Sequence, residues 1–373
     1  MKNNKVNFIY TIVFFLIMGC NSTNNNSLQE YHSEYIKYGR LTDPGENVYM
    51  LQSLPDDINE MSEIANVQGV HITMLSQWKI PRAEWNLAHA NHDIKDILDT
   101  LKVKGNGKLT KDRKLEDRVL GACTKESIFS AAMLKSKGIP ARIRVGYLTN
   151  LYSGDKAIEF WRNVNKYGNP NPSDSAAFDQ FTLYMKKVNK AIEHWVTEYW
   201  DANSKTWKVL DIRPEYLQSY GLDVSYHLPD IYFEFAHEAW LARNDSAFLN
   251  DAYSEGELDG KSHIRYQMLL DFYSLLNHDV PGLFDDEGKY ISNNENNDEL
   301  KFLKKNYDDL SQAEINELDS LAVLLNNQTN IDELLDFYST SKTLKINSMF
   351  EDRYSFVFIG QQKKAANNKF EIK

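Results

Sequence analysis

A helix that leads directly into a strand is the feature of this 373-residue chain that most constrains its fold. The segment "LGACTKESIFSAAMLKSKGIPARIRVGYL" covers residues 120–148. The helix ends at "KSKGIP", where Gly138 suits the position after a helix end and Pro140 prevents continuation, so its other end lies close to Cys123. "ARIRVGYL" at 141–148 then alternates, which predicts a strand with one buried face.

A β-hairpin is predicted further along the chain, from "EHWVTEYWD", "ANSK" and "TWKVLDI" at residues 193–212. A four-residue loop over 201–204 would place His194 directly opposite Asp211. Opposed residues share one face with Cβ atoms about 4.5–5.5 Å apart, so imidazole and carboxylate would be within hydrogen-bonding reach. A slip of one residue would put them on opposite faces.

Cys123 has two interpretations. In the first turn of a helix, a thiol faces the positive end of the helix dipole and free backbone N–H groups, which favour the thiolate and could stabilise an oxyanion. The alternative is a small, buried and inert side chain. A reactive thiol needs a base and a group that orients the base, and His194 and Asp211 are the candidates. Taken singly, His194 could be an ordinary strand residue and Asp211 the start of a loop.

In order and spacing, these segments resemble the core of the transglutaminase-like superfamily. The matching features are a cysteine that opens a helix, "GIPAR-x-R-x-GY", a histidine followed by tryptophan, and "W-x-V-L-D". The resemblance covers residues 111–225 and implies an α+β, papain-like core in which the cysteine helix packs on an antiparallel sheet. It implies Cys123 as nucleophile, His194 as general base and acid, and Asp211 as the group that fixes the imidazole. The chain departs from the family pattern at "TKES" after the cysteine. The backbone N–H of Cys123 is the expected half of the oxyanion hole, and no side chain is identified for the other half.

The N-terminus has the features of a bacterial lipoprotein signal. Two lysines precede an apolar run at 6–18 that is too short to span a bilayer, and "LIMGC" resembles a lipobox ending in Cys20. We expect residues 1–19 to be a signal peptide and 20–45 a tether lipidated at Cys20, which places the protein in the cell envelope. An ordinary signal peptide or short membrane anchor with an incidental cysteine is the alternative.

The rest of the chain divides into regions that differ in hydrophobic periodicity and composition. We expect a helical region at 46–110, the catalytic core at 111–225 with an insert at 151–190, a helical extension at 226–290, and a polar linker with C-terminal helices at 291–373. The insert suits a lid, a substrate wall or decoration. Ser311 and Glu314 form a capping-box pattern, and the H-x-x-H pair His89 and His92 is interpreted as surface or packing histidines.

The predicted function is that of a cell-envelope thiol enzyme acting on an amide or peptide bond through a thioester. Water as acceptor would make it a protease, peptidase or deamidase, and an amine would make it an acyltransferase. The alternative is a non-catalytic lipoprotein that binds a peptide or glycan on the same scaffold. The net charge of −11 disfavours nucleic acid as a partner. We expect a monomer with a peptide or protein amide substrate, contact with the membrane through Cys20, and no cofactor or metal.

Overall fold

The computed structural model describes residues 32–39, 41–75, 77–89, 93–105, 107–157, 159, 183–245, 248–254, 258–276, 303, 305–327, 331–341 and 344. Its strands are β1 (Gly69–His71), β2 (Val119–Gly121), β3 (Ala141–Leu148), β4 (Ile192–Asp201), β5 (Thr206–Leu210) and β6 (Phe233–Phe235). Its α-helices are α2 (Val48–Gln52), α3 (Ile58–Asn66), α4 (Ile94–Gly105), α5 (Cys123–Ser136), α8 (Pro214–Ser219), α9 (Ala236–Ala242), α10 (Asn250–Tyr253), α11 (Gly260–Leu275), α13 (Gln312–Asn326) and α14 (Ile331–Thr340).

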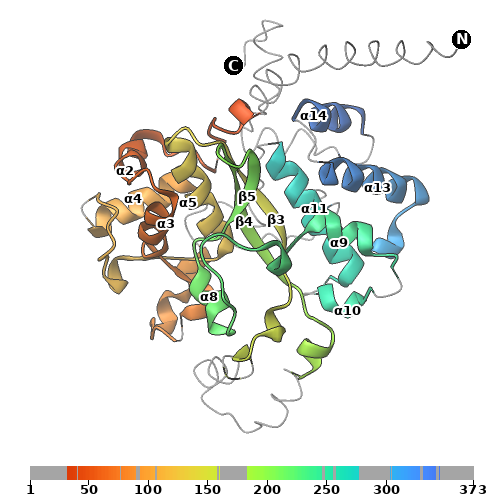
Figure 1. The fold of residues 1–373 in the computed structure, drawn as a ribbon, viewed down its shortest axis with the longest axis horizontal. Coiled ribbons are helices and arrows are strands. Elements are labelled where there is room, and N and C mark those ends of the chain that lie inside the picture. The colour runs from red at the N-terminus through yellow and green to blue at the C-terminus, as the bar shows by residue number, and fades with distance from the viewer. Residues whose placement is uncertain are drawn as a thin grey trace, which may run out of the picture.

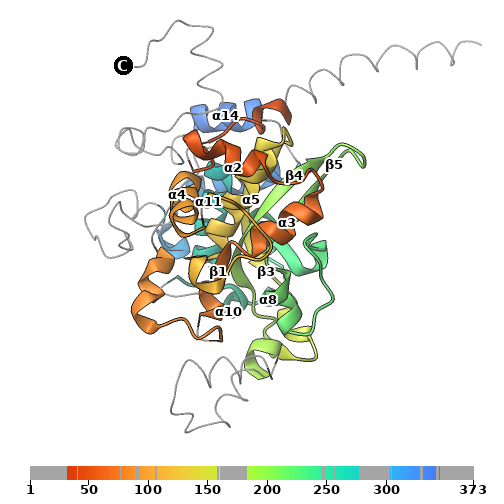
Figure 2. The same cartoon turned by 90° about the vertical axis from the view of Figure 1, so that its left-hand side faces the viewer.

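The centre of the molecule is a four-stranded antiparallel sheet in the order β5-β4-β3-β6. Figure 1 shows this sheet between α2–α5 on one side and α9, α11 and α13 on the other. The α+β class with a cysteine-bearing helix on an antiparallel sheet is therefore confirmed. Figure 2 shows the end of the β4–β5 hairpin projecting from one side of the molecule.

Helix α5 begins and ends where the sequence predicts. Cys123 is its first residue, and Gly138 beyond its end has a left-handed φ of 71°. The Gly138 N–H bonds to the Lys135 carbonyl and the Ile139 N–H to the Leu134 carbonyl, which together form a Schellman motif. Residues 127–135 of the helix are all buried, because α5 lies between the sheet and the N-terminal helices. The helix that carries Cys123 is therefore fixed by packing on both of its sides.

Strand β3 is buried on both faces, so the expectation of a single buried face is wrong. Arg142 and Arg144 are only 5% and 4% exposed. Both donate to the same Glu198 oxygen, at 2.7 and 2.6 Å, and Arg144 also makes two 2.9 Å bonds to Asp271 of α11. Charges are buried only when they are paired in this way, and alternation of residue types does not reveal the partners.

Helix α11 covers the edge of β3 that β6 leaves free. Strand β6 pairs only with residues 146–148 of β3. Next to that stretch, Val145 N–H donates to Asp271 at 2.8 Å and the Ser274 hydroxyl donates to the Ile143 carbonyl at 2.9 Å. Side chains of α11 thus satisfy backbone groups that an exposed edge would leave unpaired. The C-terminal helices therefore complete the sheet.

Two predicted helical stretches contain strands. Residues 69–71, inside the helical region expected at 46–110, form β1, which pairs in parallel with β2. Residues 233–235, inside the helical extension expected at 226–290, form β6, and helix α9 follows directly. Both strands have three residues and obtain their partners from distant parts of the chain, so local periodicity does not reveal them. The capping box of Ser311 and Glu314 at α13 is confirmed.

Several predictions concern residues outside the described ranges. They are the signal peptide at 1–19, Cys20, most of the tether, the centre of the 151–190 insert, the polar linker at 291–299, His92 and the side chain of His89. The domain boundaries stay predictions.

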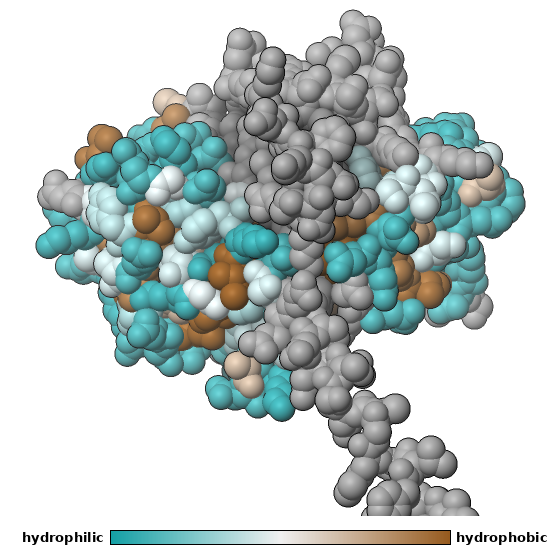
Figure 3. Space-filling view, turned by 90° about the horizontal axis from the view of Figure 1, so that it is seen from above, coloured by the Kyte–Doolittle hydropathy of each residue, from teal (hydrophilic) through white to brown (hydrophobic). Residues whose placement is uncertain are grey.

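Among the described residues, no helix has both the length and the apolar character needed to cross a membrane. On the face seen in Figure 3, hydrophobic residues lie singly or in small groups among hydrophilic ones, which is ordinary for a protein surface.

Candidate active site

Cys123 lies at the N-terminal tip of α5. It is partly exposed and has no disulfide partner. The N-cap residue, Ala122, has an extended backbone and provides no side-chain cap for the helix. The Lys125 and Glu126 N–H groups bond to the Ala122 carbonyl, which leaves the N–H groups of Cys123 and Thr124 as the donors for the sulfur or a bound anion. Cys123 is therefore partly exposed and lies next to the positive end of the helix.

His194 and Asp211 are in direct contact. Nε2 of His194 lies 2.9 Å from Oδ2 of Asp211, and the two residues are 5% and 6% exposed. The other Asp211 oxygen accepts the backbone N–H of Arg213 at 2.8 Å. The carboxylate is therefore fixed at both oxygens. With Nε2 engaged, Nδ1 is the nitrogen of His194 that is left for the thiol, and a side-chain hydrogen bond links His194 to Cys123.

The hairpin register differs by two residues from the prediction. Thr197 pairs with Leu210 and Trp200 with Trp207, so the loop is 202–205 rather than 201–204. Asp201 stays in β4, and its side chain closes the turn by accepting bonds from the Asn203 N–H at 3.0 Å and the Ser204 hydroxyl at 2.7 Å. A shift of two residues keeps the face of every side chain, and for this reason His194 and Asp211 still meet.

The electrostatics of the site favour a thiolate beside an imidazolium. Burial opposes ionisation of Cys123, but the hydrogen bond and charge of His194, together with the neighbouring His71 ring, outweigh it and lower the thiol pKa to about 7. Burial also opposes protonation of His194, but the charge and hydrogen bond of Asp211, with a further contribution from Cys123, raise the pKa of the imidazole well above its usual value. For Asp211, the His194 charge outweighs burial and lowers the carboxyl pKa. Because the thiol pKa lies below the imidazole pKa, the proton rests on His194 at neutral pH.

His71 is a residue of this site that the sequence analysis missed. It ends β1 and pairs with Gly121, two residues before Cys123. Its ring is buried, with 8% exposed, and contacts the Cys123 thiol. The sequence offered one weak signal, Gly69 followed by the β-branched residues of "VHIT", which suits a short strand. Its partner strand β2 lies about 50 residues away along the chain, and nothing local identifies it.

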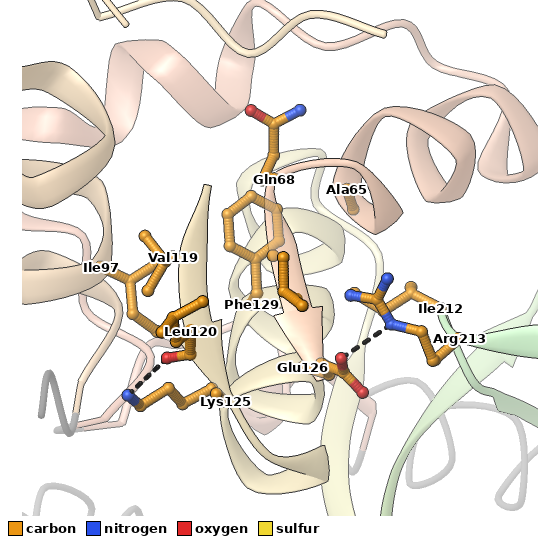
Figure 4. A pocket seen from close by; sticks show the side chains of 13 residues that line it. Ala65, Gln68, Ile97, Val119, Leu120, Lys125, Glu126, Phe129, Ile212 and Arg213 are labelled. Atoms are coloured by element: carbon orange, nitrogen blue, oxygen red, sulfur yellow. Dashed lines mark hydrogen bonds and ion pairs between the residues drawn. The ribbon is translucent and has the colours of Figure 1, made fainter. Parts of the chain in front are cut away.

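Arg213 ties the loop that holds Asp211 to the helix that holds Cys123. Its Nε donates to Glu126 of α5 at 2.9 Å, and one Nη donates to Glu215 of α8 at 2.8 Å. Figure 4 shows the Arg213–Glu126 pair beside a small cavity of about 30 Å³, space for roughly one water molecule. Lys125 lines the same cavity and donates to the Leu120 carbonyl, and burial lowers its pKa to about 7. These contacts fix the first turn of α5 relative to Asp211.

Comparison with known families covers the part of the chain that holds these residues. Residues 83–212 match the family model of the Transglutaminase-like superfamily. The matched segment begins before β2, includes α5, β3, β4 and β5, and ends one residue after Asp211, so Cys123, His194 and Asp211 all lie within it. His71 lies outside it. No curated protein and no solved structure gives a significant match to the chain.

The arrangement suits nucleophilic chemistry at a carbonyl group. It combines a partly exposed cysteine whose thiol pKa is low, an imidazole held by a carboxylate, and backbone donors at a helix tip. Within the described residues, no cluster of three or more His, Cys, Asp or Glu side chains is placed to hold a metal ion.

Proposed function

We propose that the protein is a thiol enzyme that cleaves or transfers the acyl group of an amide or peptide bond through a thioester on Cys123. One observation carries the proposal: the Cys123 sulfur, at the tip of α5, contacts an imidazole whose far nitrogen lies 2.9 Å from the Asp211 carboxylate. The match of residues 83–212 to a superfamily with this chemistry supports it.

In the first step, the Cys123 thiolate adds to the carbonyl carbon and forms a C–S bond, and the carbonyl electron pair moves onto oxygen. When the carbonyl re-forms, the C–N bond breaks and His194 gives its proton to the leaving nitrogen. Asp211 keeps the imidazole in the tautomer and orientation that this transfer requires. The products of the step are a free amine and a thioester.

In the second step, an acceptor resolves the thioester. His194, now neutral, takes a proton from water as the water oxygen bonds to the acyl carbon, and the C–S bond breaks to regenerate the thiolate and imidazolium pair. A primary amine in place of water would give acyl transfer. We favour hydrolysis, because Cys123 is partly exposed and water would reach a thioester formed on it.

We further propose that the enzyme is anchored in a bacterial cell envelope through Cys20. The support comes from the sequence alone, in the apolar run at 6–18 and the "LIMGC" that ends in Cys20. A single exported thiol beside a base would then meet peptides of the envelope as its substrates. Mass spectrometry of the purified protein for a diacylglyceryl group on Cys20 tests this anchor independently of activity.

The catalytic proposal is tested by alkylation with iodoacetamide as a function of pH. Wild-type Cys123 should react with an apparent pKa of about 7. His194→Ala should move that pKa upward toward the ordinary thiol value of about 8.5, because the main source of stabilisation for the thiolate is lost. His227→Gln, a histidine that contacts Tyr199 rather than the thiol, is the matched control and should leave the profile unchanged.

Incubation with a library of peptides and peptidoglycan fragments then identifies the reaction. A mass change of hydrolysis, deamidation or ligation that is lost in Cys123→Ala supports the enzyme. Slow alkylation that does not depend on His194, together with binding but no mass change, would instead identify a non-catalytic binding protein.

A further inference from the structure

His71 has an unfilled hydrogen-bonding position in a crowded site. Its Nε2 is fully buried, and although the ring acts on the Cys123 thiol, Nε2 makes no hydrogen bond of good geometry to the sulfur or to any other atom in the resting structure. Buried polar atoms are nearly always satisfied, and an exception in a site of this kind calls for a partner that arrives during function. The Cys123 sulfur, the atom that would carry the substrate carbonyl, lies in contact with this ring.

The tautomer of His71 is fixed by its other nitrogen. Nδ1 accepts the backbone N–H of Thr73 at 3.3 Å and lies 2.8 Å from the Thr73 hydroxyl. Since a backbone N–H can only donate, Nδ1 carries a lone pair and the ring hydrogen of the neutral imidazole is on Nε2. His71 therefore offers a donor toward the sulfur.

The fold also fixes the position of the ring. The β1–β2 pairing sets His71 opposite Gly121, and the turn Ile72–Met74 that follows begins with the His71 side chain as its N-cap. The ring of Tyr216 packs against His71 at 5.8 Å with a 33° tilt. A donor held on three sides is preorganised, which is the property that makes a hydrogen bond effective in a transition state.

We propose that His71 is a catalytic residue of the same reaction, whose Nε2–H and the backbone N–H of Cys123 together bind the oxyanion formed when the thiolate adds to the substrate carbonyl. This inference rests on the proposed function. The two donors come from the end of β1 and the start of α5, and the His71–Gly121 register holds these elements together.

The groups bonded to the far nitrogen of each histidine show that His71 is not a second general base. His194 has a carboxylate behind it, which stabilises the imidazolium that acid–base work requires. His71 has instead a backbone N–H behind it, which keeps a lone pair on Nδ1 and the ring hydrogen on Nε2. The two histidines on the sulfur are therefore assigned different roles, proton transfer for His194 and hydrogen-bond donation for His71.

Two reactions of the same thiol test this proposal. Alkylation by iodoacetamide is a displacement at a saturated carbon, in which iodide leaves and no oxyanion forms. Acylation by p-nitrophenyl acetate passes through a tetrahedral oxyanion. Both rates are measured at a pH well above the thiol pKa of each variant, so that the contribution of His71 to that pKa does not enter.

His71→Leu, which has no donor, should lower the acylation rate by about 10²-fold and leave the alkylation rate unchanged. His71→Gln, which has an amide donor, should recover part of the loss. Equal losses in both reactions would show that His71 only shapes the site, and unchanged acylation would show that it does not bind the oxyanion. If wild-type protein is alkylated but not acylated, the proposed function itself fails, which separates the two hypotheses.

Discussion

His194 and Asp211 meet on a diagonal across the β4–β5 hairpin. The register pairs Thr197 with Leu210, so its continuation places Val196 opposite Asp211 and His194 two residues beyond. The 2.9 Å contact is therefore made by side chains that reach along the sheet rather than straight across it. A diagonal contact requires that both side chains are fixed, and the Arg213 N–H supplies this for the carboxylate.

Asp211→Asn should destabilise the thiolate of Cys123 without disturbing the fold. The Asn oxygen can still accept the Arg213 N–H, but its NH₂ group would then donate to Nε2 of His194 and leave the ring hydrogen on Nδ1. Nδ1 could no longer take the thiol proton. We expect the apparent pKa of Cys123 to rise from about 7 and the alkylation rate at neutral pH to fall by about tenfold or more. An unchanged pH profile would show that Asp211 does not set the state of His194.

Gly138→Ala should lower stability without affecting the thiol. The left-handed φ of 71° disfavours any residue with a Cβ, while nothing lies within 4 Å of the added atom, so the cost is conformational alone. We expect the free energy of unfolding to fall by about 1–2 kcal/mol, measured by urea denaturation. Gly138→Asn is the matched control and should cost less, because Asn tolerates this conformation. Equal losses would contradict the conformational explanation.

The elements predicted correctly from the sequence are those specified by local residues. Gly138 and Pro140 end α5, and the alternation of 141–148 gives the bounds of β3. The contact of His194 with Asp211 was found although the register was wrong by two residues, because strand periodicity is also two. A register error of two residues leaves a prediction about which face of a strand a side chain occupies unchanged. It makes a prediction about which residue lies directly opposite wrong.

The features that the sequence did not reveal all depend on distant partners. The buried arginines of β3 look like solvent-facing residues until Glu198 and Asp271 are placed beside them. His71 looks like part of a helical stretch until β2 pairs with β1. In both cases the deciding contact joins segments far apart in the chain, and no local pattern encodes it.

Asp271→Ala should destabilise the fold strongly. It removes both bonds from Arg144 to α11 and the acceptor for the Val145 N–H, and it leaves a buried guanidinium with Glu198 as its remaining carboxylate partner. Breaking a buried ion pair from one side costs about 3–5 kcal/mol, which urea denaturation would measure. Asp336→Ala, at an exposed position of α14, should change stability by less than about 0.5 kcal/mol. A loss as small as that of the control would show that α11 is held by apolar packing alone.

The pH dependence should differ between two reactions of Cys123. Alkylation requires only the thiolate, so its rate should rise through a pKa of about 7 and then stay constant. Cleavage of an amide also requires the proton on His194, whose pKa is raised, so its rate should rise through the same pKa and fall again as the imidazolium loses its proton at alkaline pH. Measurement of both rates on one preparation tests the assignment, because a falling alkaline limb in alkylation as well would indicate unfolding rather than the titration of His194.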